Sequence, residues 1–238
     1  MDAAASTHAH ERALPTGTVE LVFNLHANQQ FGEAVICGPH ASYFVLDTSV
    51  PSSVIGVHFK PGGAAAFLGA PAGEFADRHV DLSDVWGARA RELRERLVEA
   101  GSEGPRFAML EEALLARIRR PLLPHPAVAH AVLQLMTEPT LMKIEELRKD
   151  AGYSPKHFIE LFRDSVGLAP KLFSRIRRFQ GVLERLAGGE RVEWAGVAAD
   201  GGFYDQSHLN REFRAFAGTT PGEYRPLADR PNHVPVDE

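Results

Sequence analysis

Cysteine is almost absent from this 238-residue chain, in which Cys37 is the only one. A single thiol excludes a disulfide framework and a cysteine-based zinc site, and it is typical of proteins in a reducing compartment. Long apolar runs are absent too, and residues 1–12 are polar, without the apolar core of a secretion signal. We therefore expect a soluble protein located in the cytoplasm, with no membrane partner.

An excess of basic residues is also missing, since the net charge of the chain is −5. The acidity is uneven, because residues 1–126 carry 11 Lys and Arg against 15 Asp and Glu, whereas residues 127–225 carry 14 against 13. Binding to phosphates depends on where the cations lie more than on net charge. The composition therefore predicts weak non-specific attraction to nucleic acid, and it does not exclude a nucleic-acid partner.

What the chain does contain is a repeat. Two stretches, which begin at Gly152 and Gly202, follow the same pattern of a glycine-containing turn and an amphipathic helix, each preceded by a shorter helical pattern. The two glycines are 50 residues apart, and from His157 and His208 onward the separation is 51. This is the pattern of a helix-turn-helix motif, present twice. Two such motifs on one chain indicate a protein that binds double-stranded DNA.

Hydrophobic periodicity divides the chain into a strand-rich first half and a helical second half. Alternating β-branched residues predict four strands of one antiparallel sheet, near residues 19–25, 33–37, 42–46 and 53–59. Helical spacing predicts helices near 64–68, 82–100 and 106–118, then seven more near 127–137, 143–150, 155–165, 171–187, 193–200, 205–216 and 221–225.

We therefore expect an α+β fold, in which a small antiparallel β-rich N-terminal domain with helices is followed by an all-α domain of seven helices that contains two helix-turn-helix subdomains. The prolines between the halves cannot continue a helix, so they mark the boundary. The expected parts are a disordered leader at 1–16, a sensor or dimerisation domain at 17–120, a proline-rich linker at 121–126, the tandem helix-turn-helix domain at 127–225 and a flexible tail at 226–238.

The helix after each turn is expected to present its polar face to DNA. In the second copy this face has many side chains that can recognise base edges, because Gln and Asn can bond adenine edges and Arg can bond guanine. The first copy offers fewer, with Lys156 for guanine, Ile159 for a thymine methyl and Glu160 for a cytosine amine, so we expect the second copy to carry most of the discrimination. The candidate DNA-binding residues are Lys156, Ile159, Glu160, Arg163, Gln206, Ser207, Asn210, Arg211 and Arg214.

The stretch from Trp194 to Arg225 closely matches the C-terminal signature of the AraC/XylS class of bacterial transcription regulators, which the chain resembles over residues 127–225. The resemblance implies seven helices whose two subdomains enter successive major grooves on one face of the DNA. One departure is Arg148, which stands where this family usually has a small alanine, so its long side chain must extend toward water or shift the packing. The resemblance implies base contacts at Lys156, Ile159, Glu160, Gln206, Ser207 and Arg211.

Residues 17–25 and 56–68 resemble a small domain of unknown function that often precedes this type of DNA-binding module. In the AraC/XylS class, such N-terminal parts typically sense a small molecule or mediate dimerisation. A β-rich pocket would serve the first role, and the alternative is that the same side chains only fill a core. The candidate ligand-binding residues are Phe23, His26, Tyr43, Phe44, His58 and Phe59.

We interpret the chain as a sequence-specific DNA-binding transcription regulator of the nucleoid, not an enzyme, whose N-terminal domain senses a small-molecule effector or forms a homodimer. RNA polymerase is a further candidate partner. No cofactor and no metal are expected, because the scattered histidines lack a close His-x-His spacing with a following carboxylate. Two alternatives stay open: an architectural or partner-docking DNA-binding protein without ligand sensing, and a DNA-binding module fused to a small enzyme domain, for which Cys37 in a strand is a poor nucleophile.

Overall fold

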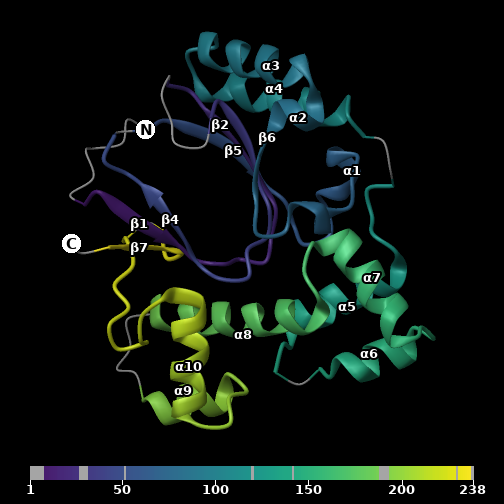
Figure 1. Ribbon diagram of the computed structural model, residues 1–238, viewed down its shortest axis with the longest axis vertical. Coiled ribbons are helices and arrows are strands. Elements are labelled where there is room, and N and C mark those ends of the chain that lie inside the picture. Colours follow the sequence, from purple (N-terminus) through teal and green to yellow (C-terminus); the bar gives the residue numbers. More distant parts are fainter. Residues whose placement is uncertain are drawn as a thin grey trace.

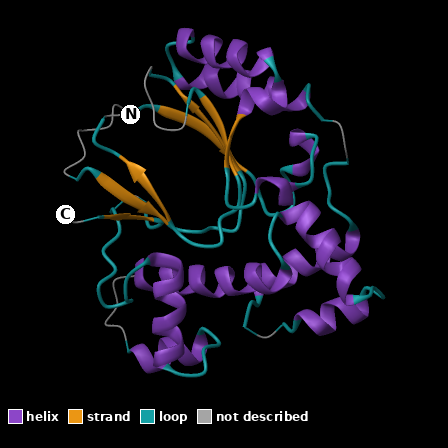
Figure 2. Ribbon diagram, viewed as in Figure 1, coloured by secondary structure: helices purple, strands orange, loops and turns teal. Residues whose placement is uncertain are grey.

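The structure is a computed structural model that describes residues 8–26, 32–50, 52–118, 121–140, 142–187, 193–228 and 230–236. It confirms the expected α+β class, because two β-sheets with covering helices form the N-terminal half and helices form most of the C-terminal half (Figures 1 and 2). Within these residues, no helix combines the length and the apolar character that crossing a bilayer requires.

A four-stranded antiparallel sheet, in the order β5-β2-β3-β6, forms the base of the N-terminal half. Helices cover one of its faces (Figure 2). The side chains of Leu21, Phe23 and Ile36 are fully buried in the core there. The bounds of these elements are β2 Glu20–Asn24, β3 Ala34–Cys37, β5 Val54–His58, β6 His79–Asp81, α1 Ala65–Leu68, the 3₁₀ helix η1 Ala72–Phe75, α2 Leu82–Trp86, α3 Ala88–Glu99 and α4 Glu103–Leu115.

A second, three-stranded sheet joins both ends of the described chain. Strand β1 (His10–Ala13) lies between β4 (Phe44–Asp47) and β7 (His233–Pro235), antiparallel to both. The carboxylate of Glu11, buried in β1, is held by hydrogen bonds from His8 (2.9 Å) and His233 (3.0 Å).

Several expectations about the ends of the chain are therefore wrong. Residues 10–13 and 233–235 pair as strands, so a disordered leader over 1–16 and a flexible tail over 226–238 do not describe them; residues 1–7, 229 and 237–238 lie outside the described residues. The four strands expected from the alternating pattern are present, but β4 belongs to the second sheet and not to one common sheet. Alternation shows that a segment is a strand and cannot show which strand it will pair with.

Two helix expectations also need correction. The single helix expected over residues 82–100 is two helices, because the backbone at Gly87 takes φ 65° and ψ −151° and ends α2 there. Residues 221–223 form a turn and not a seventh helix. The carboxylate of Glu223 there accepts hydrogen bonds from the Thr219 and Thr220 hydroxyls (3.1 and 2.7 Å) and from the Thr220 amide (3.1 Å).

Helix α8 is the centre of the C-terminal half. Its apolar stripe is buried in one core that contains residues of both repeats, and Figure 1 shows α8 running between α7 on one side and α10 on the other. The bounds of the helices are α5 Pro126–Thr137, α6 Ile144–Asp150, α7 Pro155–Val166, α8 Pro170–Ala187, α9 Trp194–Asp200 and α10 Gln206–Ala217.

The two halves share more than the proline-containing segment. Leu14 from the N-terminal half and Val234 from the C-terminal strand are both buried in the core around α8. The amide of Gln180 on α8, a buried polar side chain, donates to the carbonyl of Pro15 (2.8 Å) and to Oδ1 of Asn232 (2.9 Å). Both ends of the described chain are therefore fastened to the helix that connects the two repeats.

Candidate nucleic-acid interface and interior pocket

The repeat seen in the sequence is a repeat in space. Helices α7 and α10 begin and end at equivalent positions, 51 residues apart. Each starts at a side-chain cap, since Ser154 Oγ accepts from the His157 amide (3.3 Å) and Asp205 Oδ1 accepts from the His208 amide (2.7 Å). Such caps satisfy amides that the first turn of a helix leaves unpaired.

The turns that precede these helices are formed as expected. Gly152 follows α6 with φ +74°, and Gly202 follows α9 with φ +69°, a conformation that side chains other than glycine rarely adopt. Each copy is thus a short helix, a left-handed glycine turn and a longer amphipathic helix. This is the geometry of a helix-turn-helix motif. We refer to residues 144–167 as the first motif and to residues 194–218 as the second motif.

In the second motif, the outer face of α10 carries the expected readers. Leu209, Phe213 and Phe216 are buried on its inner side. Gln206, Ser207, Arg211 and Arg214 are exposed, and Asn210 is partly buried. Within the described part of the chain, Arg211 forms no ion pair, so its guanidinium is available to a DNA partner.

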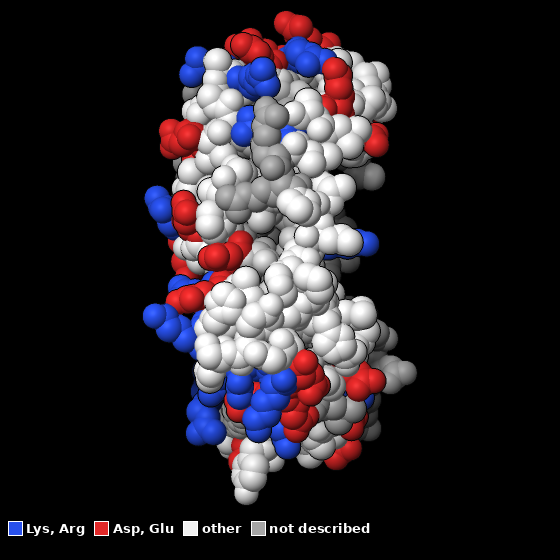
Figure 3. Space-filling view, turned by 90° about the vertical axis from the view of Figure 1, so that its right-hand side faces the viewer, with Lys and Arg blue, Asp and Glu red and all other residues white. Residues whose placement is uncertain are grey.

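In the first motif, α7 has the same inner face but a weaker outer face. Lys156, Ile159, Glu160 and Arg163 are all exposed, and the side chain of Lys156 is 87% exposed. The ammonium of Lys156 lies 3.9 Å from the Glu160 carboxylate, one helical turn away. A carboxylate at that position partly neutralises the only lysine of this helix and presents negative charge to a phosphate backbone. Figure 3, which shows the side of the molecule with α6 and α7, has acidic and basic side chains intermingled over its lower part.

Arg148 is accommodated without opening the core of the first motif. Its guanidinium folds over the turn that follows α6, donates to the carbonyl of Tyr153 and donates to the Glu145 carboxylate at 2.6 Å. Leu147, the neighbour of Arg148, is buried in the core. The cation therefore caps the turn, and its side chain lies folded against the protein with only 16% of its surface exposed.

The second motif is held to α8 by arginines. Arg175 on α8 makes two parallel hydrogen bonds of 2.8 Å to the Glu212 carboxylate on α10, and its guanidinium lies over the ring of Phe216. Burial raises the pKa of Glu212, but hydrogen bonding and charge from Arg175 outweigh burial and leave that pKa below its ordinary value. Arg178 donates to the carbonyl of Gly202 at 2.8 Å. These contacts fix α10 and the turn before it against α8.

One exposed residue of the second motif was missed by the sequence reasoning. The offset between the copies changes from 50 to 51 because the second turn contains one additional residue, and Tyr204 fills that position with 93% of its surface exposed. The amide of Tyr204 donates to Nδ1 of His208 (3.3 Å), which fixes the backbone there. The change of offset was the signal that could have found it. This exposed phenol lies two residues before Gln206, next to the capping residue Asp205.

The two candidate reading helices point the same way. Both α7 and α10 run with their C-terminal ends toward the N-terminal half, so that their first turns point away from it (Figure 1). Helix-turn-helix proteins contact base edges through the N-terminal residues of the second helix. The N-terminal half therefore leaves the first turns of both helices, with Lys156 and Gln206, free to enter a groove.

Comparison with known proteins agrees with this geometry. Residues 147–226 match a family model described as a helix-turn-helix domain, one of the AraC type. The chain carries an AraC-type DNA-binding domain. It is a DNA-binding transcription regulator, which confirms the family resemblance found in the sequence. Residues 1–81 match a model described as a domain of unknown function, DUF6597.

No curated protein sequence matches this chain. Among solved structures, it is similar to ToxT from Vibrio cholerae O395, with 10% identity, a TM-score of 0.48 and coverage of 92% of this chain and 93% of that chain. It is also similar to an unsaturated fatty acid-bound ToxT from Vibrio cholerae strain SCE256, with 10% identity, a TM-score of 0.43 and coverage of 94% and 88%. Likeness at that level indicates nothing about the ligand or partners of this regulator.

An interior pocket of about 540 Å³ lies between the two sheets of the N-terminal half. Of the six residues expected to bind a ligand, only Phe44 and His58 line it. Phe23 and Phe59 are buried on the opposite, helix-covered face of the four-stranded sheet. His26 is exposed and does not line the pocket, and Tyr43 packs against the core around α8.

The pocket has one aromatic wall, formed by His40, Phe44 and His79. Their ring centroids lie 4.5 to 4.8 Å apart. Burial, and then the charge of His40, lowers the pKa of His79 to about 4, and burial also lowers the pKa of His40. Both rings are therefore neutral near pH 7. The Nε2 atom of His40 is buried and makes no hydrogen bond within the described residues.

The charged groups around the pocket are mostly acidic. Glu11, Glu20 and Asp47 line it, whereas Arg230 is its only arginine and the lining, drawn from the described residues, contains no lysine. Arg230 lies 3.3 Å from Glu11. Glu20 lies 3.0 Å from His58, and that hydrogen bond raises the His58 pKa against the opposing effect of burial. The described residues contain no group of three or more His, Cys, Asp or Glu arranged to hold a metal ion.

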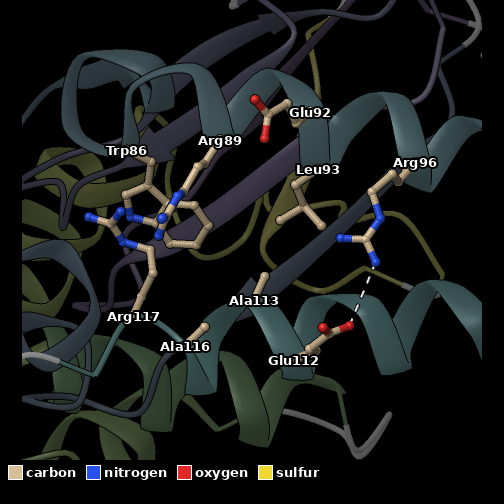
Figure 4. Close-up of a pocket in the computed structure, with 9 residues that line it drawn as sticks. All are labelled: Trp86, Arg89, Glu92, Leu93, Arg96, Glu112, Ala113, Ala116 and Arg117. Atoms are coloured by element: carbon tan, nitrogen blue, oxygen red, sulfur yellow. Dashed lines mark ion pairs between the residues drawn. The ribbon is translucent and has the colours of Figure 1, made fainter.

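A second, smaller hollow of about 210 Å³ lies between α3 and α4 (Figure 4). Its charged groups interact with their neighbours: Arg96 lies 3.6 Å from Glu112, and the Arg117 guanidinium lies 4.8 Å from the centre of the Trp86 ring. It offers less than half the volume of the pocket between the sheets. The larger pocket is therefore the better candidate for a ligand site.

Proposed function

We propose that this transcription regulator reads DNA sequence mainly with α10 and uses α7 as a weaker second reader. The observation that carries the proposal is the exposed, unpaired Arg211 in the outer face of α10, with Gln206 and Ser207 one turn before it. Arginine pairs with guanine through two hydrogen bonds, and glutamine can do the same with adenine. Asn210, Arg214 and Tyr204 lie beside these readers and are assigned to further base or backbone contacts.

On the first motif, we assign Lys156, Ile159 and Glu160 to base edges and Arg163 to a phosphate. Its reading is weaker because the only lysine of α7 is paired within the helix at 3.9 Å. Arg163 and Arg214 occupy equivalent positions in the two copies, near the C-terminal ends of their helices. Contacts there fix register on the duplex and carry little sequence information.

The test uses duplexes that the full chain selects from a random-sequence pool. Arg211→Ala is expected to weaken binding to the selected duplex by about 1–3 kcal/mol and to relax the preference at one base pair. Arg91→Ala removes an equal charge from the exposed side of α3 and is the matched control. Equal losses on selected and random duplexes would show that Arg211 contacts only the backbone.

We further propose that the pocket between the sheets binds a small-molecule effector. Its volume suits a small organic molecule, and its excess of carboxylates over cations disfavours an anionic one. The expected ligand is uncharged or cationic, with an apolar ring to pack on Phe44. This would make the chain a one-component regulator, and homodimerisation and RNA polymerase contact remain proposals without a surface assigned to them.

A thermal-shift screen tests the effector proposal, because a ligand that binds the folded state raises the melting temperature. The panel contains uncharged and amine-bearing ring compounds together with carboxylates of matched size. Hits are expected in the first two groups, and they should disappear in Val22→Phe, which places a larger side chain in the pocket lining. Hits confined to carboxylates would contradict the assigned ligand class, and no hits at all would favour a regulator without an effector.

A further inference from the structure

The two candidate reading helices end at glycines that touch the same segment of the N-terminal half. Gly167 ends α7 with φ +94° and Gly218 ends α10 with φ +69°, at equivalent positions of the repeat. A Cβ atom at residue 167 would collide with Cγ of Pro39, and one at residue 218 would lie 2.7 Å from Cε1 of Tyr43. Both approaches are possible only because glycine has no side chain.

The segment that makes these contacts, residues 38–44, connects the two sheets and is itself held firmly. The backbone amide of Ala41 donates to the Asp77 carboxylate at 2.6 Å, and the carbonyl of Pro39 accepts from the Asp77 amide at 3.2 Å. Arg12 from β1 lies over the ring of Tyr43, 5.4 Å from its centre. A segment fixed at both ends can act as a rigid brace.

The opposite side of the same segment belongs to the interior pocket. Gly38, His40 and Phe44 line the pocket, whereas Pro39 and Tyr43 contact the two motifs. Anything that fills the pocket against the aromatic wall therefore touches the segment that contacts both motifs.

Without this segment, α8 would be the main structure that sets the distance between the motifs. One connection through a single helix leaves each motif some freedom to rotate about the contact. A second contact, at the far end of each reading helix, closes a ring of packed elements: α7, α8, α10 and residues 38–44. Reading two successive grooves needs a fixed separation of about 34 Å, one turn of the duplex.

We propose that Pro39 and Tyr43 are positioning residues of the DNA interface, which hold the ends of α7 and α10 and so set the half-site spacing that the regulator accepts. The inference rests on the proposed function, in which both helices read DNA. It assigns to the N-terminal half a direct role in specificity, through geometry and without any contact to DNA.

The experiment measures spacing preference. The probes are a duplex selected by the full chain from a random-sequence pool, the same duplex with one or two base pairs inserted between its half-sites, and a duplex that keeps only the half-site of the second motif. For wild type, two inserted base pairs are expected to lower affinity by about tenfold, because rigidly linked sites lose their joint binding when the geometry does not fit. For the Pro39→Ala/Tyr43→Ala double variant, the same insertion is expected to lower affinity by about threefold or less. Its affinity for the single half-site should equal that of wild type.

Three further variants separate positioning from folding. Tyr43→Phe keeps the ring that contacts Gly218 and should keep the wild-type spacing profile. Gly218→Ala should broaden the profile, whereas Gly69→Ala should not, because it introduces a side chain at a similar φ of +75°, outside both motifs and with nothing within 4 Å. Melting temperatures report folding of every variant.

The outcomes are distinguishable. If wild type selects no sequence, the proposed function fails. If it selects a two-part site and the folded double variant keeps the wild-type spacing profile, the proposed function stands and the positioning role of Pro39 and Tyr43 is wrong.

Discussion

The two helix-turn-helix motifs share a backbone and differ in how they are charged and supported. In the second motif, α10 presents an unpaired Arg211 and is tied to α8 by the two 2.8 Å hydrogen bonds between Arg175 and Glu212. In the first motif, position 161 takes the place of Glu212 and holds a leucine. The first motif has an additional contact with the N-terminal half, where a Cβ atom at Gly73 in η1 would lie 3.1 Å from the carbonyl oxygen of Arg163.

The difference indicates a division of labour. A reader that must distinguish bases needs cations in a fixed place, and the ion pair to α8 supplies that rigidity to α10. A helix whose lysine is paired and whose end is packed against another domain contributes mainly position. Duplicated motifs can therefore keep one fold while the specificity moves to one copy, and substitutions in each motif should separate these roles.

The largest expected effect comes from removing the ion pair between Arg175 and Glu212, which joins the second motif to α8. Glu212→Ala should lower the free energy of unfolding by about 2 kcal/mol, because it removes two charge-assisted hydrogen bonds and leaves the partly buried Arg175 unpaired. Chemical denaturation measures the loss. Leu161→Ala at the equivalent place in the first motif removes only apolar contact, and hydrogen exchange should then increase in α7 but not in α9 and α10. Equal exchange in both motifs after Glu212→Ala would contradict the local role of the ion pair.

The same ion pair predicts a pH dependence that is confined to the second motif. The pKa of Glu212 in the folded protein lies below its ordinary value of 4.5, with Arg175, Arg178 and His208 as the positive groups near it. The stabilisation is therefore complete above the pKa of the unfolded chain and is lost as the pH falls through the folded pKa. The free energy of unfolding is measured for wild type and for Glu212→Gln between pH 6 and pH 3. The difference between the two proteins should become smaller as the pH falls. A constant difference would show that folding does not lower the pKa of Glu212.

Tyr204 offers a smaller test, since only the second motif has the additional turn residue. Tyr204→Ala is expected to weaken DNA binding by about 1.5 kcal/mol, the lower end of the range for one hydrogen bond to a charged phosphate oxygen. Tyr204→Phe should lose as much if the hydroxyl makes the contact and much less if the ring does. Fluorescence anisotropy on the selected duplex measures both. Wild-type affinity in both variants would remove Tyr204 from the interface.

The elements of the C-terminal half could be predicted because their signals are local. Helical spacing, glycines at the turns and capping residues such as Ser154 and Asp205 all act within a few residues of the helix they define. The outer faces of α7 and α10 followed from the same periodicity. The pairing inside those faces, such as Lys156 with Glu160, also follows from the i, i+4 spacing of opposite charges on a helix.

The N-terminal half was predicted less well because its contacts are distant in sequence. Strand β1 pairs with β7, which lies more than two hundred residues further along the chain. The buried Glu11 carboxylate of β1 accepts a hydrogen bond from His233 in β7. The pocket was misassigned for a different reason. Both faces of the four-stranded sheet are covered, so alternation places Phe23 and Phe59 on one face and His58 on the other without showing which face borders a cavity.

The smallest effect should appear when the first motif is made to resemble the second. Glu160→Gln removes the carboxylate that pairs with Lys156 at 3.9 Å and keeps the size of the side chain. DNA affinity should rise by roughly 0.5 kcal/mol, the scale of an exposed ion pair, and its dependence on salt concentration should steepen because one negative charge fewer faces the DNA. Glu99→Gln makes the same charge change at an exposed position of α3 and is the control for net charge. If both variants gain the same DNA affinity, the gain comes from net charge and not from the pair between Lys156 and Glu160. The difference between the motifs would then depend only on the ion pair that holds α10 to α8.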